Sequence, residues 1–170
     1  MPNKLLEMGY IPLLLILFLV GNKAVAQDYP TKNELKALFG EKQEYLGEVD
    51  WKTCNADSAY FKSDTIILYY RNTTCFEMPR CCDYVTWTFH NAEKFQTGTF
   101  APCTEPPISS WTGYNPCKLK IRKSGDQLEL RIIDNSRQTQ VFQVTQLMRC
   151  EGNDSGYGKF GYALTLVSKR

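Results

Sequence analysis

The residues best suited to chemistry in this 170-residue chain are its cysteines, of which there are seven. Seven thiols in so short a chain are typical of a protein that folds in an oxidising compartment, where cysteines form disulfides. They stand at Cys54, Cys75, Cys81, Cys82, Cys103, Cys117 and Cys150. Cys81 and Cys82 are neighbours, and since successive side chains of an extended segment leave opposite faces, we expect each to have its own partner.

The spacing of the cysteines does not fix how they pair. A bridge across the proline-rich loop 101–117 would clamp that loop, and a bridge from Cys75 would clamp the turn that holds Pro79. A bridge between Cys54 and Cys150 would tie the early segment to the late loop. We expect three bridges: Cys103 with Cys117, Cys75 with Cys81 or Cys82, and Cys54 with Cys150. The cysteine left over is expected to be a buried free thiol, with an intermolecular bridge as the alternative.

Other side chains that could do chemistry are sparse, beginning with a single histidine, His90. The cysteine spacings lack the C-x2-C pairs of a structural zinc site. Residues 156–161 match G-x-G-x-x-G, but residues 162–167 have the pattern of a strand, whereas the dinucleotide motif opens a helix. No nucleophile signature accompanies His90, and Glu48 and Asp50 are interpreted as solvated loop charges. The sequence therefore predicts no enzyme, no cofactor and no metal.

Charge and the N-terminal segment bear on partners and location. Lys and Arg number 20 against 18 Asp and Glu, so the net charge of +2 favours neither nucleic acid nor an acidic lipid surface. Residues 1–26 have the pattern of a signal peptide, with an apolar run over 11–20 that is too short to span a membrane. We expect cleavage before Gln27, a secreted or periplasmic protein, no stable membrane insertion and one domain over 27–170.

The elements that must position these residues are a short helix and a series of strands. Thr31 and Glu34 fit a capping box, and Gly40 marks the end of the helix. Downstream the hydrophobic period is two, which predicts strands over 65–71, 84–90, 93–100, 118–122, 127–132, 140–147 and 162–167. Short turns exclude a parallel sheet, because parallel crossovers take a dozen or more residues. We predict an all-β antiparallel meander that closes into a barrel, with a sandwich as the alternative.

Two sets of residues are candidates for binding. The first consists of apolar side chains on alternating strand positions, which either form plain core or line an apolar cavity: Trp87, Phe89, Leu128 and Leu130. The second is Trp111 and Tyr114 in loop 101–117, where rigid aromatic side chains would lose little entropy on binding a partner. Asn72 and Asn153 begin formal N-glycosylation sequons in predicted loops.

The segment from Trp87 to Phe95 resembles the strand-turn-strand signature of the lipocalin-like (calycin) domains of secreted bacterial proteins. The hairpin over 119–132 is similar to the hairpin that follows in that family, and residues 141–147 with 164–166 resemble its closing strands. The resemblance covers about residues 83–169; in place of the family's Gly-x-Trp motif, two extra residues separate Gly47 from Trp51. It implies an antiparallel barrel with an apolar cavity and names no ligand.

Taken together, these observations predict a secreted, lipocalin-like binding protein for a small hydrophobic ligand. The alternative is a protein–protein interaction module of inhibitor or adhesion type that binds an extracellular protein through loop 101–117.

Overall fold

The computed structural model describes residues 29–40, 49–71, 76, 79–111, 115–151 and 160–169. Its helices are α2 (Lys32–Gly40), the 3-10 turn η1 (Ala56–Ser58) and α3 (Ala59–Lys62). Its strands are β1 (Val49–Cys54), β2 (Thr65–Arg71), β3 (Tyr84–Asn91), β4 (Lys94–Ala101), β5 (Ile108–Trp111), β6 (Cys117–Ser124), β7 (Gln127–Ile133), β8 (Thr139–Glu151) and β9 (Phe160–Lys169). The predicted signal peptide, its cleavage site before Gln27, the sequons at Asn72 and Asn153, and Tyr114 lie outside the described residues.

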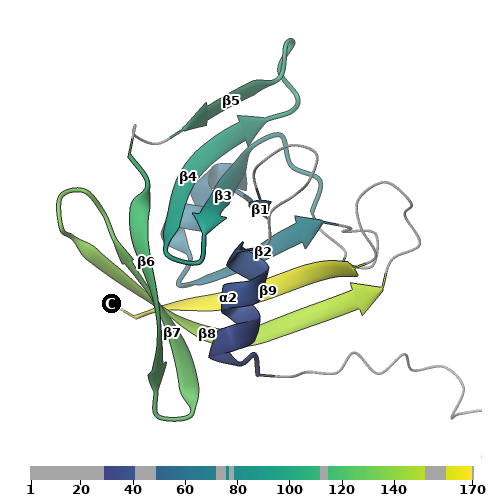
Figure 1. The fold of residues 1–170 in the computed structure, drawn as a ribbon. Coiled ribbons are helices and arrows are strands. Elements are labelled where there is room, and N and C mark those ends of the chain that lie inside the picture. The colour runs from purple at the N-terminus through teal and green to yellow at the C-terminus, as the bar shows by residue number, and fades with distance from the viewer. Residues whose placement is uncertain are drawn as a thin grey trace, which may run out of the picture.

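The strands form one antiparallel sheet that closes into a barrel (Figure 1). Strand β3 pairs with β1 on one side and with β4 on the other, so the order β3-β1-β2-β9-β8-β7-β6-β4 returns to its start. The closed eight-stranded barrel confirms the predicted all-β antiparallel fold. All seven predicted strands are present, and β1 and β5 are additional.

The interior of the barrel is filled by the apolar positions of the alternating strands. The fully buried side chains include three aromatic residues from neighbouring strands, Trp51, Trp87 and Phe95. Trp51 stacks on Tyr70 with ring centroids 5.1 Å apart, and Trp87 contacts Phe95 at 5.1 Å. Offset and edge-on contacts of this kind add to the free energy gained by burying the rings.

Helix α2 closes one end of the barrel. The predicted capping box is confirmed: the Thr31 N–H donates to Glu34 Oε2 at 2.6 Å, and the Glu34 N–H donates to Thr31 Oγ1 at 3.2 Å. These two bonds satisfy donors at the start of the helix that have no partner within it. Phe39 is fully buried and stacks on Phe89 with ring centroids 4.0 Å apart, and it also contacts Trp51 edge-on. The helix thus covers this end of the barrel with the ring of Phe39.

The disulfides follow from strand register, and the predicted pairings were wrong. The end of β1 lies beside the start of β3, with Cys54 opposite Tyr84, and this places Cys54 next to Cys81. Phe100 of β4 pairs with Tyr84 from the other side, so the chain after β4 returns to the same place and Cys103 bonds Cys82. Neighbouring cysteines therefore fasten two different strand ends, as their opposite directions predict.

These bonds replace each pairing that the sequence favoured. Cys81 and Cys82 are joined to Cys54 and Cys103, so neither bonds Cys75, and Cys54 does not bond Cys150. Cys150 is itself disulfide-bonded. Cys117 does not bond Cys103 and is free, because its position on β6, opposite Phe95, turns it toward the barrel interior. Among the described cysteines Cys117 is the free one, and it is half-buried rather than buried as predicted. Cys75 lies outside the described residues.

Candidate functional site

Strands β4 and β6 pair at only two positions in the wall of the barrel. Strand β4 pairs with β6 at Lys94 and Phe95 and then changes partner, pairing with β5 from Gly98 to Ala101. Between Phe95 and Gly98, where β4 changes partner, the wall of the barrel has a notch. Thr97, which shares the inward face with Trp87 and Phe95, lies at this notch.

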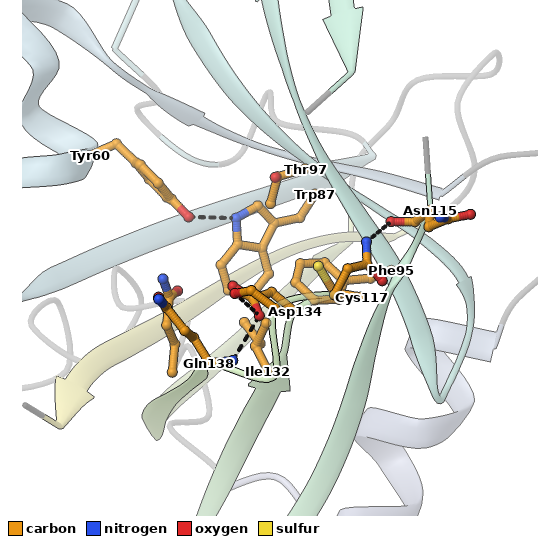
Figure 2. A pocket seen from close by; sticks show the side chains of 12 residues that line it. Tyr60, Trp87, Phe95, Thr97, Asn115, Cys117, Ile132, Asp134 and Gln138 are labelled. Atoms are coloured by element: carbon orange, nitrogen blue, oxygen red, sulfur yellow. Dashed lines mark hydrogen bonds between the residues drawn. The ribbon is translucent and has the colours of Figure 1, made fainter. Parts of the chain in front are cut away.

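A pocket of about 360 Å³ occupies the notch and the adjoining mouth of the barrel (Figure 2). Its floor consists of the inward side chains Trp87, Phe95 and Ile132. The rest of its lining is mainly polar and comes from α3, β4, the start of β6 with the residue before it, the turn between β7 and β8, and the start of β8: Tyr60, Thr97, Asn115, Cys117, Asp134, Asn135, Ser136, Gln138 and Gln140. The mouth pocket, as we call it, has an apolar floor and a polar rim.

Tyr60 covers one side of the floor. Its hydroxyl oxygen accepts a hydrogen bond of 3.0 Å from Trp87 Nε1, so the buried indole N–H is satisfied (Figure 2). The backbone N–H of Tyr60 donates to Asn55 Oδ1 at 3.3 Å, and Asn55 Nδ2 donates to Asp83 Oδ2 at 3.0 Å. This chain of bonds anchors the one-turn helix α3. Burial raises the pKa of the Tyr60 hydroxyl, and the bond from Trp87 offsets part of that shift, so the hydroxyl is neutral at ordinary pH.

The turn between β7 and β8 forms the opposite rim. Asp134 Oδ1 accepts hydrogen bonds of 2.8 Å from Ser136 Oγ and from the Gln138 N–H, which fixes the carboxylate at the edge of the pocket. Arg137 adopts the left-handed conformation with φ of 66°, which completes the tight turn. Asn135 Nδ2 donates to the Asn115 carbonyl oxygen at 3.2 Å and so ties this turn to the segment before β6.

Cys117 supplies the one thiol of the mouth pocket. Partial burial raises the pKa of this thiol, and the negative charge of Asp134 raises it further. Reactive and catalytic cysteines have the opposite property, a lowered pKa that yields thiolate at neutral pH. The thiol is therefore protonated and behaves as a small apolar group of the lining.

The predicted ligand-binding residues divide between the pocket and the core. Trp87 lies on the pocket floor. Phe89, Leu128 and Leu130 belong to the buried core cluster, and none of them lines the mouth pocket. Phe89 is covered by Phe39 of α2, which explains why the inward face of its strand is not exposed to a ligand there.

Trp111 and Tyr114 were the predicted contact residues of loop 101–117. Trp111, the one of the two that the structure describes, lies on β5 at the outside of the barrel. Its side chain crosses Gly98 of β4, where a Cβ would come within 2.6 Å of the Ser110 carbonyl oxygen and 3.2 Å of Trp111 Cε3. Glycine is therefore required for β5 and Trp111 to approach β4. A second hollow of about 240 Å³ adjoins the indole and is lined by residues that include Asp50, Lys52 and Phe100. Trp111 is 47% exposed.

Comparison with known protein families, curated proteins and solved structures finds no match for this chain. The site must be interpreted from its own geometry. In the described ranges, no three His, Cys, Asp or Glu side chains come together as a metal site would require. The same part of the chain contains no helix with the length and apolar character needed to cross a membrane. His90 is exposed at the end of β3.

The residues that sequence reasoning missed are those of the rim. Tyr60 lies in a segment without hydrophobic periodicity, so no pattern predicted it. The strands predicted over 127–132 and 140–147 imply a turn between them, but a turn in a sequence does not show which other segments it faces. The signal that could have found Tyr60 is Asn55, five residues earlier, because Asn commonly bonds a nearby backbone N–H.

Proposed function

We propose that the protein is an exported, lipocalin-like binding protein that takes a small amphipathic molecule in its mouth pocket and performs no catalysis. The observation that carries the proposal is the pocket itself, about 360 Å³ with an apolar floor and a polar rim. Ligand pockets of proteins have volumes of roughly 300 to 1,000 Å³ and combine apolar walls with a few fixed polar groups. The mouth pocket falls at the small end of that range.

The lining defines the chemistry of the ligand. A flat apolar group would lie against Trp87, Phe95 and Ile132, while the fixed carboxylate of Asp134 would accept a hydrogen bond from a hydroxyl or amine. An anionic ligand is disfavoured, because its charge would face the Asp134 carboxylate in a partly enclosed site. We therefore propose a neutral or cationic molecule with one ring or a short chain and at least one hydrogen-bond donor.

Two observations support export and the absence of catalysis. The bonds Cys54–Cys81 and Cys82–Cys103 are of the kind that persist in oxidising compartments, in agreement with the predicted signal peptide. At the site itself, the raised pKa of Cys117 keeps its thiol protonated, so the thiol is a poor nucleophile at neutral pH. The Tyr60 hydroxyl is neutral there and does not act as a base.

The experiment is a calorimetric titration with 1-naphthol, an uncharged aromatic alcohol, on the wild-type protein and two variants. Gln140→Phe places a ring at the pocket edge and should weaken binding by roughly tenfold or more, since it displaces the ligand from the lining. Thr139→Phe adds the same ring one residue earlier, on the opposite face of β8, and should leave the affinity unchanged. Wild-type protein that binds neither 1-naphthol nor a panel of small neutral amphiphiles would contradict the proposal, as would equal binding by the two variants.

A second candidate function is protein–protein interaction through β5. Trp111 is 47% exposed, and a large exposed apolar side chain on a fixed strand is typical of contact surfaces. Ile108 is 57% exposed and lies on the opposite face of the same strand. A partner that uses this surface would lose more than about tenfold in affinity to Trp111→Ala and nothing to Gln140→Phe. The reverse pattern would assign the partner to the mouth pocket instead.

A further inference from the structure

The outer face of the barrel concentrates positive charge over four strands. On β6, the buried residues Leu119 and Ile121 alternate with exposed Lys118, Lys120 and Arg122. Strand register adds outward cations from β4, β7 and β9. The cationic face, as we define it, comprises Lys94, Lys118, Lys120, Arg122, Arg131 and Lys169.

Like charges stand directly opposite each other on this face. Lys94 pairs with Lys118, and Lys120 pairs with Arg131. Side chains in such positions have Cβ atoms about 5 Å apart, and like charges there destabilise the sheet. Two pairs of this kind on adjacent strands are not explained by the stability of the fold.

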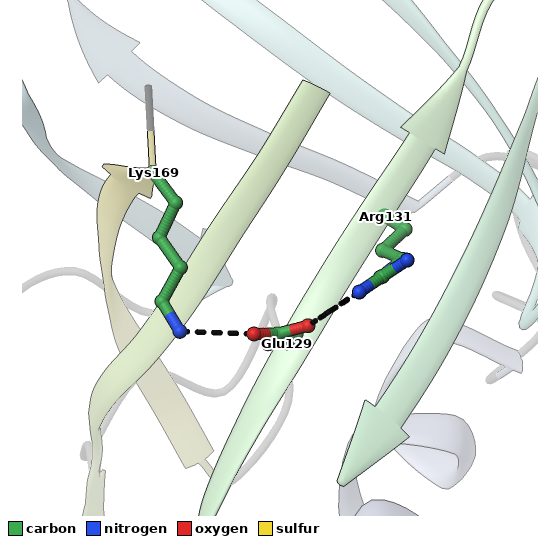
Figure 3. A network of polar contacts seen from close by, with 3 residues as sticks. All are labelled: Glu129, Arg131 and Lys169. Atoms are coloured by element: carbon green, nitrogen blue, oxygen red, sulfur yellow. Dashed lines mark hydrogen bonds and ion pairs between the residues drawn. The ribbon is translucent and has the colours of Figure 1, made fainter. Parts of the chain in front are cut away.

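Glu129, the one acidic residue of β4, β6, β7 and β9, stands opposite Arg122 and offsets part of this charge. On these four strands no acidic residue stands opposite Lys94, Lys118 or Lys120. Glu129 is 5% exposed, and its oxygens already bind Lys169 Nζ at 2.9 Å and Arg131 Nη2 at 3.2 Å (Figure 3). The carboxylate therefore lies between Arg131 and Lys169 and neutralises part of their charge. Six cations against one anion on these four strands leave the face positive, and its unpaired charge lies mainly at Lys94, Lys118 and Lys120, on a chain whose net charge is only +2.

The arrangement of the cations favours one class of anionic partner. Along β6 they recur at every second residue, a spacing of about 6.8 Å, which suits a linear polymer with regularly repeated charges. Single-stranded nucleic acid is bound by stacking on aromatic side chains, and β6 and β7 contain none. Insertion into a lipid surface uses large exposed apolar residues, and those of the described chain, Tyr29, Phe61, Ile108 and Trp111, all belong to other elements.

We propose that the cationic face binds a linear anionic polysaccharide, with sulfate or carboxylate groups that pair with the row on β6. The partner neutralises the repulsion between the paired cations, so binding gains from the same arrangement that weakens the free sheet. This surface is separate from the mouth pocket, because its side chains point outward while those of the pocket floor point inward.

The test uses heparin as the probe in a calorimetric titration at several salt concentrations. The triple variant Lys118→Gln, Lys120→Gln, Arg122→Gln should bind heparin roughly tenfold or more weakly, and its dependence of log affinity on log salt should be shallower by about three contacts. A matched control, Lys32→Gln, Lys36→Gln, Arg80→Gln, removes the same charge from exposed positions elsewhere and should stay close to wild type. Thermal unfolding should show that the first variant is folded, because the like-charge pairs of Lys118 and Lys120 that it removes offset the loss of the pair between Arg122 and Glu129.

Three outcomes would overturn the proposal. Wild-type protein that does not bind heparin would exclude the interaction. Equal losses in the two triple variants would assign it to net charge alone. Tighter binding of a single-stranded oligonucleotide or of phosphatidylserine vesicles than of heparin, lost in the β6 variant, would assign the face to a different class of partner.

Discussion

The two ends of the barrel are covered in different ways. At the α2 end, Phe39 fills the opening and stacks on Phe89, in direct contact with Trp51. At the mouth, Tyr60 covers the floor by packing against the core and by its hydrogen bond to Trp87, and a pocket remains beside it. One end is closed by buried aromatic rings, and the other keeps an open pocket with polar groups at its edge.

The two buried tryptophans show what this difference means. Trp87 Nε1 donates to Tyr60, whereas Trp51 Nε1 is buried among aromatic rings and has no hydrogen-bond partner in the described chain. A buried unsatisfied donor is tolerated where surrounding packing compensates for it. The α2 end is therefore built for stability, and the mouth retains polar groups that a ligand can use.

Among the tests of this comparison, Phe39→Ala is expected to have the largest effect on the free energy of unfolding. Loss of a fully buried phenyl ring should lower the free energy of unfolding by about 3 to 5 kcal/mol, because it removes both the burial and the packing of α2. Urea unfolding followed by circular dichroism measures the loss. Lys36→Ala, an exposed position of the same helix, should change it by less than about 0.5 kcal/mol. A loss below about 1 kcal/mol for Phe39→Ala would show that the packing of Phe39 does not hold the helix on the end of the barrel.

A smaller effect is expected at the mouth from Tyr60→Phe. The variant keeps the ring but leaves Trp87 Nε1 without its acceptor, which should lower the free energy of unfolding by about 1 to 3 kcal/mol. The same urea experiment measures it, with Tyr29→Phe at an exposed position as the control. If Tyr60→Phe leaves the stability unchanged, the hydrogen bond does not hold the cover in place.

The smallest effect on stability is expected for Glu129, in the barrel wall between the two ends, and this effect depends on pH. The hydrogen bond from Lys169, and then that from Arg131, hold the pKa of Glu129 below its ordinary value of 4.5, and partial burial opposes them. Because the folded pKa is the lower one, the carboxylate stabilises the fold above pH 4.5, and this contribution disappears as pH falls through the lowered value. The stability difference between wild type and Glu129→Gln should shrink over that interval. A difference that is constant or grows on acidification would contradict this account.

The sequence predicted the local structure well and the long-range contacts poorly. Thr31 with Glu34 predicted the helix start, and the alternation of Trp87 and Phe89 predicted their inward face, because both signals lie within one element. The disulfides depend on which strand ends meet at Tyr84, which needs the sheet order. Spacing along the chain favoured a Cys103–Cys117 bridge, but the register of β6 with β4 turns Cys117 inward.

The mouth pocket could not be predicted for the same reason. Tyr60, Asn115, Thr97 and Asp134 come from four separate segments that meet only after the barrel closes. The sequence indicated an apolar interior able to hold a ligand, and in the structure most of that interior is filled by its own side chains. The remaining space lies at the edge, where β4 changes partner from β6 to β5.

The most direct test of the central claim, that ligand enters the mouth and not the packed interior, is the alkylation of Cys117. N-ethylmaleimide should modify this thiol slowly at neutral pH and faster as the pH rises, because its raised pKa keeps it protonated. Mass spectrometry can assign the label to Cys117 and follow its rate. Saturating 1-naphthol should slow the reaction several-fold in the wild-type protein and have no effect in Gln140→Phe. Binding of 1-naphthol with an unchanged rate at Cys117 would place the ligand elsewhere and contradict the account.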